Sequence, residues 1–107
     1  MEKNLKYGLL LQIYGKLLTE RQRDIMSSYY DYDLSLAEIS ENLRISRQAV
    51  LNAIQIGCAS LDSYESELKI YEKNRVLEQK LEILKTNVGK RSASELTEDI
   101  DEIIGIL

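Results

Sequence analysis

A chain of 107 residues with 44% hydrophobic residues and no proline, tryptophan or phenylalanine suits one helical domain with a helical extension. Its formal net charge of −4, with no histidine and one cysteine, excludes an internal disulfide and a zinc cluster of the usual kind, and provides no overall attraction for nucleic acid. No apolar run approaches the ~20 residues of a membrane span, and the start Met1-Glu-Lys-Asn-Leu-Lys lacks the apolar core of a signal peptide. We therefore expect a cytoplasmic protein without membrane insertion.

The first two predicted helices cover residues 5–17 and 20–30. In the first, leucine or isoleucine recurs every four residues and further apolar residues lie beside them, so we expect the rest of the domain to enclose this helix. Thr19 is followed three residues later by Gln22, the arrangement of a capping box that opens the second helix. The predicted buried face of that helix consists of Ile25, Met26, Tyr29 and Tyr30.

Residues 34–54 predict two short helices joined by a tight turn. Ser35 with Glu38 is a second capping box, and Ser46 can cap the next helix. Apolar residues recur at spacings of three and four in both segments, and Ile45 lies in the turn between them. Caps, periodicity and turn length thus agree on a helix-turn-helix.

The second of these helices carries the candidate reading residues. A DNA-reading helix-turn-helix places the first turns of its second helix against base edges, where Arg pairs with guanine and Gln or Asn with adenine. Arg47, Gln48 and Asn52 occupy those positions. An exposed polar first turn without any such role has the same composition, and from Ser46 to Cys58 the only charged residue is Arg47.

The C-terminal half predicts a helical extension. We expect the helix to continue past Gly57, because Leu61, Tyr64, Leu68 and Tyr71 follow at heptad-like spacing. The pattern loses phase across residues 73–75, resumes over residues 77–88, and stops at residues 87–91. Ser92 then opens a third capping box with an apolar stripe over residues 96–107.

These elements predict an all-α protein, a helix-turn-helix bundle over residues 1–58 with a helical extension over residues 59–107. The extension packs on the domain or on a second subunit. Because two apolar stripes, over residues 61–71 and 96–107, are more than a small domain buries easily, we expect a homodimer. The predicted core consists of Leu9, Ile13, Ile25, Tyr29, Leu36, Ile39, Leu43, Ile45, Val50 and Ile54.

Enzyme chemistry finds little support. The chain has no histidine, no glycine-rich phosphate loop and no metal-ligand spacing, so we expect no catalytic residues, no cofactor and no metal. Cys58 is expected to be a packed side chain, because no histidine is present to activate it.

The segments 18–23, 34–43 and 45–50 (LTERQR, LSLAEISENL and ISRQAV) resemble region four of bacterial sigma factors. The segments 14–23, 29–36 and 46–50, joined by LDSYESEL at 61–68, are more similar still to the YlxM-like family, small bacterial proteins usually encoded beside signal recognition particle genes. The resemblance covers roughly residues 5–72. It implies a sigma-like helix-turn-helix protein with a regulatory role linked to that particle.

Three positions depart from the family pattern. Arg44 stands where relatives usually carry glycine in the turn, and Ser40 replaces the alanine common at the helix crossing. Gln55 and Ile56 replace basic residues usual after the second helix. The loss of these cations weakens the DNA-binding interpretation.

Two functions follow as expectations. The first is an accessory protein of the signal recognition particle pathway that binds the particle's protein or its RNA, and the second is a DNA-binding regulator. The candidate contacts are Arg21, Arg23, Arg44, Arg47, Gln48 and Asn52. With so few cations, any DNA binding is expected to be weak and largely independent of sequence.

Overall fold

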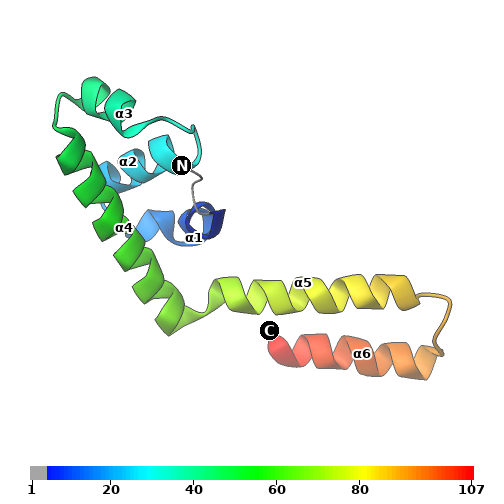
Figure 1. The fold of residues 1–107 in the computed structure, drawn as a ribbon. Coiled ribbons are helices and arrows are strands. Elements are labelled where there is room, and N and C mark those ends of the chain that lie inside the picture. The colour runs from blue at the N-terminus through cyan, green and yellow to red at the C-terminus, as the bar shows by residue number, and fades with distance from the viewer. Residues whose placement is uncertain (1–4) are drawn as a thin grey trace. The chain divides into compact units, whose positions relative to one another are not determined.

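The computed structural model describes residues 5–107, which form six α-helices and one short 3-10 helix and contain no β-strand (Figure 1). The all-α prediction is therefore confirmed. The chain divides into two compact units, the first ending at Lys69 and the second spanning Ile70–Leu107. The signal-peptide prediction concerned residues 1–6, and residues 1–4 of that segment lie outside the described part of the chain.

The first unit begins with α1 (Leu5–Tyr14), which tightens into the 3-10 helix η1 (Gly15–Leu17), and continues with α2 (Glu20–Tyr30). The predicted capping box of α2 is present in both directions. The Thr19 hydroxyl accepts a hydrogen bond from the backbone N–H of Gln22, and the Gln22 side chain accepts one from the N–H of Thr19. Local sequence therefore fixes the start of α2.

The next two helices are α3 (Leu36–Leu43) and α4 (Arg47–Leu68). Ser35 and Glu38 form the predicted reciprocal box, with backbone-to-side-chain distances of 3.0 and 3.1 Å. The Ser46 hydroxyl accepts from the Ala49 N–H at 3.0 Å. Both caps that define the helix-turn-helix are thus confirmed.

The core of the first unit lies where α1, α2 and α3 meet α4. Half of the predicted core list is buried, and Ile13, Leu36 and Ile45 are half-buried. Leu9 and Leu43 were predicted wrongly, because both side chains are exposed. The helix α1 is apolar on every side, so its four-residue periodicity does not select the face that packs. The full buried set is Leu10, Leu11, Tyr14, Leu18, Ile25, Met26, Tyr29, Ile39, Val50, Ile54 and Leu61.

Helix α4 passes through Gly57 without a break, as expected. A Cβ atom at Gly57 would lie 2.7 Å from Sδ of Met26, whose side chain is fully buried. The absence of a side chain therefore allows α2 and α4 to pack closely. The expected domain boundary after residue 58 falls inside this continuous helix, whereas the two compact units divide eleven residues later.

Helix α4 ends at Leu68 because Lys69 adopts a left-handed conformation with φ of 53°. The expected loss of helical phase at residues 73–75 is not a break, since α5 (Ile70–Asn87) runs through it. The heptad-like pattern from Leu61 to Tyr71 is therefore split. Leu61 belongs to the core of the first unit, and Tyr71 belongs to the second unit.

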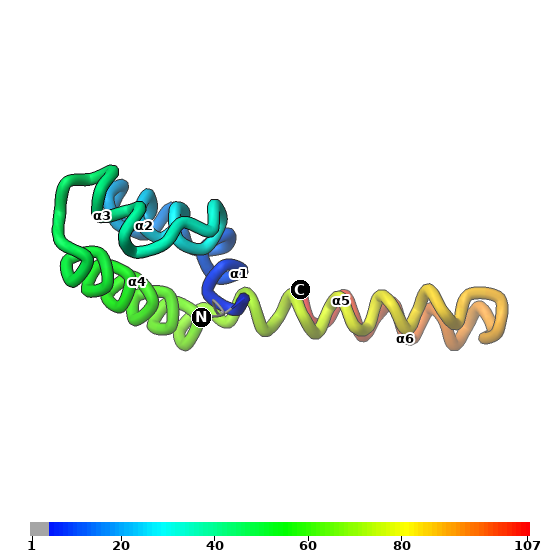
Figure 2. Tube along the Cα trace, turned by 45° about the horizontal axis from the view of Figure 1, so that its top comes forward, coloured from blue at the N-terminus to red at the C-terminus, as the bar shows by residue number. Residues whose placement is uncertain are grey.

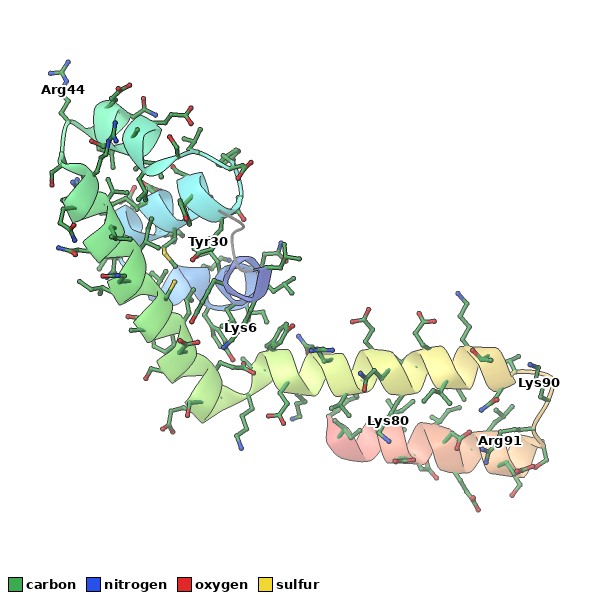
Figure 3. The ribbon with its side chains drawn as sticks, in the orientation of Figure 1. Lys6, Tyr30, Arg44, Lys80, Lys90 and Arg91 are labelled. Atoms are coloured by element: carbon green, nitrogen blue, oxygen red, sulfur yellow. The ribbon has the colours of Figure 1, made fainter. Side chains whose placement is uncertain are left out.

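The second unit is a hairpin of α5 and α6 (Ala93–Ile106), which lie side by side in Figures 1 and 2. The predicted stop is present, with Gly89 at φ of 85°, and Ser92 and Glu95 form the third capping box. An ion pair between Lys80 and Glu102 joins the helices (Figure 3). Neither helix contains a fully buried residue. The hairpin therefore has an apolar seam but no enclosed core.

Candidate nucleic-acid or partner interface

The turn between α3 and α4 is closed by hydrogen bonds around Ser40. Its hydroxyl donates to the carbonyl of Ile45 at 2.6 Å, and its own carbonyl accepts from the Ile45 N–H at 3.2 Å. Arg44, between them, has φ of 57° and ψ of 45°, the left-handed conformation that glycine adopts without strain. Arg44 therefore keeps the left-handed turn in which relatives usually carry glycine, and it bears the strain of that turn rather than adopting another one.

The left-handed turn directs the first turns of α4 outward. Arg47 is the first residue of the helix, and the side chains of Arg47, Gln48 and Asn52 are all exposed. Gln48 donates a hydrogen bond from its side-chain amide to that of Asn52 at 2.9 Å. The two residues expected to contact bases thus form a hydrogen bond with each other. This bond would have to break before either side chain could pair with a base.

The structure brings four of the six candidate residues together, because Arg44, Arg47, Gln48 and Asn52 belong to one turn and the two helical turns after it. In Figure 3, Arg44 points away from the helices of its unit. Arg21 and Arg23 lie on the first turn of α2. Arg21 is exposed, whereas Arg23 is half-buried with its stem near Gly15.

The four arginines of this set differ from the cations of the hairpin in their ion pairing. Among residues 5–107, none of Arg21, Arg23, Arg44 and Arg47 forms an ion pair, whereas Lys80 and Arg91 of the hairpin do. Lys6 at the other end of the first unit is also occupied, with its ammonium 3.3 Å from a carboxylate oxygen of Asp62. Unpaired guanidinium groups near the helix-turn-helix are suited to phosphate or carboxylate groups.

Beyond Arg47 the exposed face of α4 carries no charge until Asp62. Asn52, Gln55 and Ile56 are exposed there, and Ile56 retains 57% of its accessible surface. A reading helix that follows the major groove usually meets phosphates with cations at such positions. This face is instead neutral and partly apolar, which is more typical of a protein contact than of a long DNA contact.

Sequence reasoning missed a tyrosine cluster that joins α1, α2 and α4. Tyr7 donates a hydrogen bond to Asp62 at 2.8 Å, and Tyr30 lies 3.3 Å from the sulfur of Cys58. The Tyr7 and Tyr30 rings are 6.1 Å apart. The absence of other aromatic residues indicated that tyrosine hydroxyls would need partners, but only the fold brings these distant residues together.

The cluster is not arranged for nucleophilic chemistry. Burial raises the pKa of the Cys58 thiol, and the hydrogen bond from Tyr30 opposes that rise only in part. The hydrogen bond to Asp62, with burial, raises the pKa of Tyr7 to about 12. Both groups are therefore protonated near neutral pH, where a thiol is a weak nucleophile.

The described residues do not group into a metal site. Within residues 5–107, no three His, Cys, Asp or Glu side chains are placed to hold a metal ion together. No helix in that range is long and apolar enough to cross a membrane. The arrangement of the first unit supports binding through exposed arginines and a neutral helix face.

The matches to known proteins extend over both units of the chain. The sequence profile of the UPF0122 family, described as "Putative helix-turn-helix protein, YlxM / p13 like", matches residues 1–103. A UPF0122 protein of Clostridium perfringens is 40% identical over 104 residues, covering 97% of this chain and 91% of the relative. One of Exiguobacterium sp. is 39% identical over 107 residues, covering 100% and 94%. One of Fusobacterium nucleatum is 36% identical over 100 residues, covering 94% and 97%.

Proposed function

The chain belongs to the YlxM/p13-like family of helix-turn-helix proteins, and from that premise we propose that it is an accessory protein of the signal recognition particle pathway in the cytoplasm. It acts by binding rather than by catalysis. The helix-turn-helix unit binds the RNA of the particle or the protein of the particle. The link to the particle comes from the gene neighbourhood usual for this family, and the interface comes from the geometry of the first unit.

The observation that carries the proposal is the distribution of unpaired cations. The four arginines lie at the start of α4 and on the first turn of α2, where Arg23 is half-buried and Arg21 is exposed, and the long face of α4 beyond them is neutral. A few arginines suit the backbone of a structured RNA, which is recognised largely by shape and phosphate contacts. The neutral face is suited to packing against a protein surface beside that RNA.

The test measures binding to purified particle protein, to particle RNA and to the assembled particle at micromolar concentration. Two charge-reversed variants are compared with the natural chain, Arg21→Glu with Arg23→Glu, and Arg44→Glu with Arg47→Glu. We expect each pair to weaken association by about tenfold, because two attractive contacts become repulsive. The RNA-only and protein-only measurements identify which component the arginines contact.

A matched control reverses two exposed cations of the second unit, Lys73→Glu with Arg75→Glu. This variant has the same net charge as the test variants and should bind like the natural chain. Circular dichroism establishes that helicity is retained in all of them. Absence of binding to protein, RNA and assembled particle at micromolar concentration contradicts the proposal. Equal weakening by the control would contradict the assignment of the interface.

A DNA-binding regulator is the second candidate, favoured by the exposed amide pair Gln48 and Asn52 on α4. One cation on that helix leaves few counterions to release, so DNA binding should be weak and only slightly dependent on salt. A gel-shift assay with genomic fragments at physiological salt separates the two functions. Nanomolar, site-selective binding would replace the first proposal with the second.

A further inference from the structure

The hairpin of α5 and α6 leaves apolar side chains of both helices uncovered within its own unit. On α6, Ile100 and Ile104 retain 44% and 59% of their accessible surface. On α5, Leu81 retains 51%. Two helices that enclose no residue are marginal by themselves, because most helical stability in proteins comes from packing an apolar face.

Leu81, Ile100 and Ile104 lie on the same edge of the hairpin, whereas Ile83 lies beside Lys80 and Glu102. Lys80 and Asp99 are half-buried near the seam between the two helices, and they form ion pairs with Glu102 and Arg91. One step along a helix turns the side chain by about 100°. Leu81 follows Lys80 and Ile100 follows Asp99, and because the helices are antiparallel both steps lead to the same side of the seam.

The charges on this apolar edge are self-complementary. Glu78, Leu81 and Lys85 are spaced by three and four residues, so they share one face of α5, and all three are exposed. Glu78 and Lys85 form no ion pair among the described residues. An acid and a base thus lie at equal intervals on either side of the Leu81–Glu82 peptide. A partner of one charge sign would match one of them and repel the other.

From this arrangement we propose that the apolar edge binds the same edge of a second copy of this chain. The two hairpins form a four-helix bundle in which α5 lies antiparallel to α5 around Leu81. Glu78 of one copy then lies opposite Lys85 of the other, and the two-fold axis repeats the pair. The carboxylates of α6 that pair with Lys80 and Arg91 are held in ion pairs within the hairpin and do not oppose this contact.

The interface is independent of the proposed function, because it uses the second unit and no arginine of the helix-turn-helix. The resulting symmetric dimer contains two helix-turn-helix units, one from each copy. A two-fold arrangement can engage two sites on a partner at once, which raises the overall affinity without any new contact.

The test is sedimentation equilibrium of the full chain from low to high micromolar concentration. We expect a dimer, and we expect Glu78→Lys and Lys85→Glu each to weaken it by about tenfold, because each turns two attractive pairs into repulsive ones. The double variant Glu78→Lys with Lys85→Glu restores both pairs with reversed sign and should return the dimer to its original strength. Leu81→Asp should leave a monomer at all concentrations used.

Two matched controls separate the edge from general effects of charge. The control for Lys85→Glu is Lys90→Glu, which makes the same lysine-to-glutamate change in the exposed turn between the two helices. The control for Leu81→Asp is Val76→Asp, which places an aspartate at another exposed apolar position of α5. Both should remain dimers, and circular dichroism checks that every variant stays helical. A natural chain that stays monomeric at high micromolar concentration overturns the proposal. A dimer that neither charge reversal weakens, or that the double variant does not restore, overturns the assigned edge.

Discussion

Replacing Gly57 with alanine should destabilise the first unit, although alanine is the better helix former. The new Cβ would lie 2.7 Å from Sδ and 3.0 Å from Cγ of Met26, a side chain with no solvent-exposed surface. Overpacking a close-packed core costs about 1–3 kcal/mol, and the gain in helix propensity offsets about 1 kcal/mol of that. The expected net loss in the free energy of unfolding is therefore about 0–2 kcal/mol.

The matched control is Gly8→Ala, in helix α1 of the same unit. A Cβ at Gly8 would meet no atom of residues 5–107 within 4 Å, so only the propensity gain of about 1 kcal/mol applies there. The free energy of unfolding, measured by urea denaturation, should thus differ by about 1–3 kcal/mol between the two alanine variants. In a Met26→Ala background the cost at Gly57 should disappear. If Gly57→Ala stabilises the natural chain as much as Gly8→Ala does, the close packing of α2 on α4 is refuted.

Three further perturbations have defined outcomes. Ile39→Ala should lower the free energy of unfolding by about 2–5 kcal/mol in urea denaturation, since Ile39 is 2% exposed, and a near-neutral effect would contradict its place in the core. Arg44→Gly should raise it by about 1 kcal/mol, because glycine adopts φ of 57° without strain, and a loss of stability would refute that strain. The pKa of Tyr7 is raised to about 12 in the folded chain from its ordinary 10, so the hydrogen bond to Asp62 stabilises the fold fully below pH 10 and is lost as the pH rises toward 12. The stability difference between the natural chain and Tyr7→Phe should therefore shrink between pH 10 and pH 12 in urea denaturation, and a constant difference would contradict this linkage.

The helix starts were determined by the sequence, because capping is a local interaction. A serine or threonine accepts a hydrogen bond from a backbone N–H three residues later, and no distant contact is needed. Thr19, Ser35, Ser46 and Ser92 were therefore all predicted as caps, and all four act as caps in the structure. The positions of the helix-turn-helix arginines followed from the same local signals.

The helix ends were harder to predict, because a left-handed residue other than glycine has no clear sequence signal. Lys69 ends α4 in this way, and the sequence placed the irregularity at residues 73–75 instead. Residues with φ near +55° are uncommon outside glycine, so neither composition nor periodicity points to one. The contrast with Arg44 is informative, since there the family resemblance indicated a position where glycine is usual.

Which apolar face packs, and which polar groups meet, depended on tertiary structure. Periodicity identifies a face only when the other side of the helix is polar, and α1 offers apolar residues all round. Its core contacts are Leu10, Leu11 and Tyr14 rather than Leu9, because α2 and α4 lie against that side. Contacts such as Tyr7 with Asp62 join residues 55 positions apart. The sequence by itself therefore determined the local hydrogen bonds that start α2, α3, α4 and α6. The three-dimensional packing decided which side chains are buried and which remain exposed to a partner.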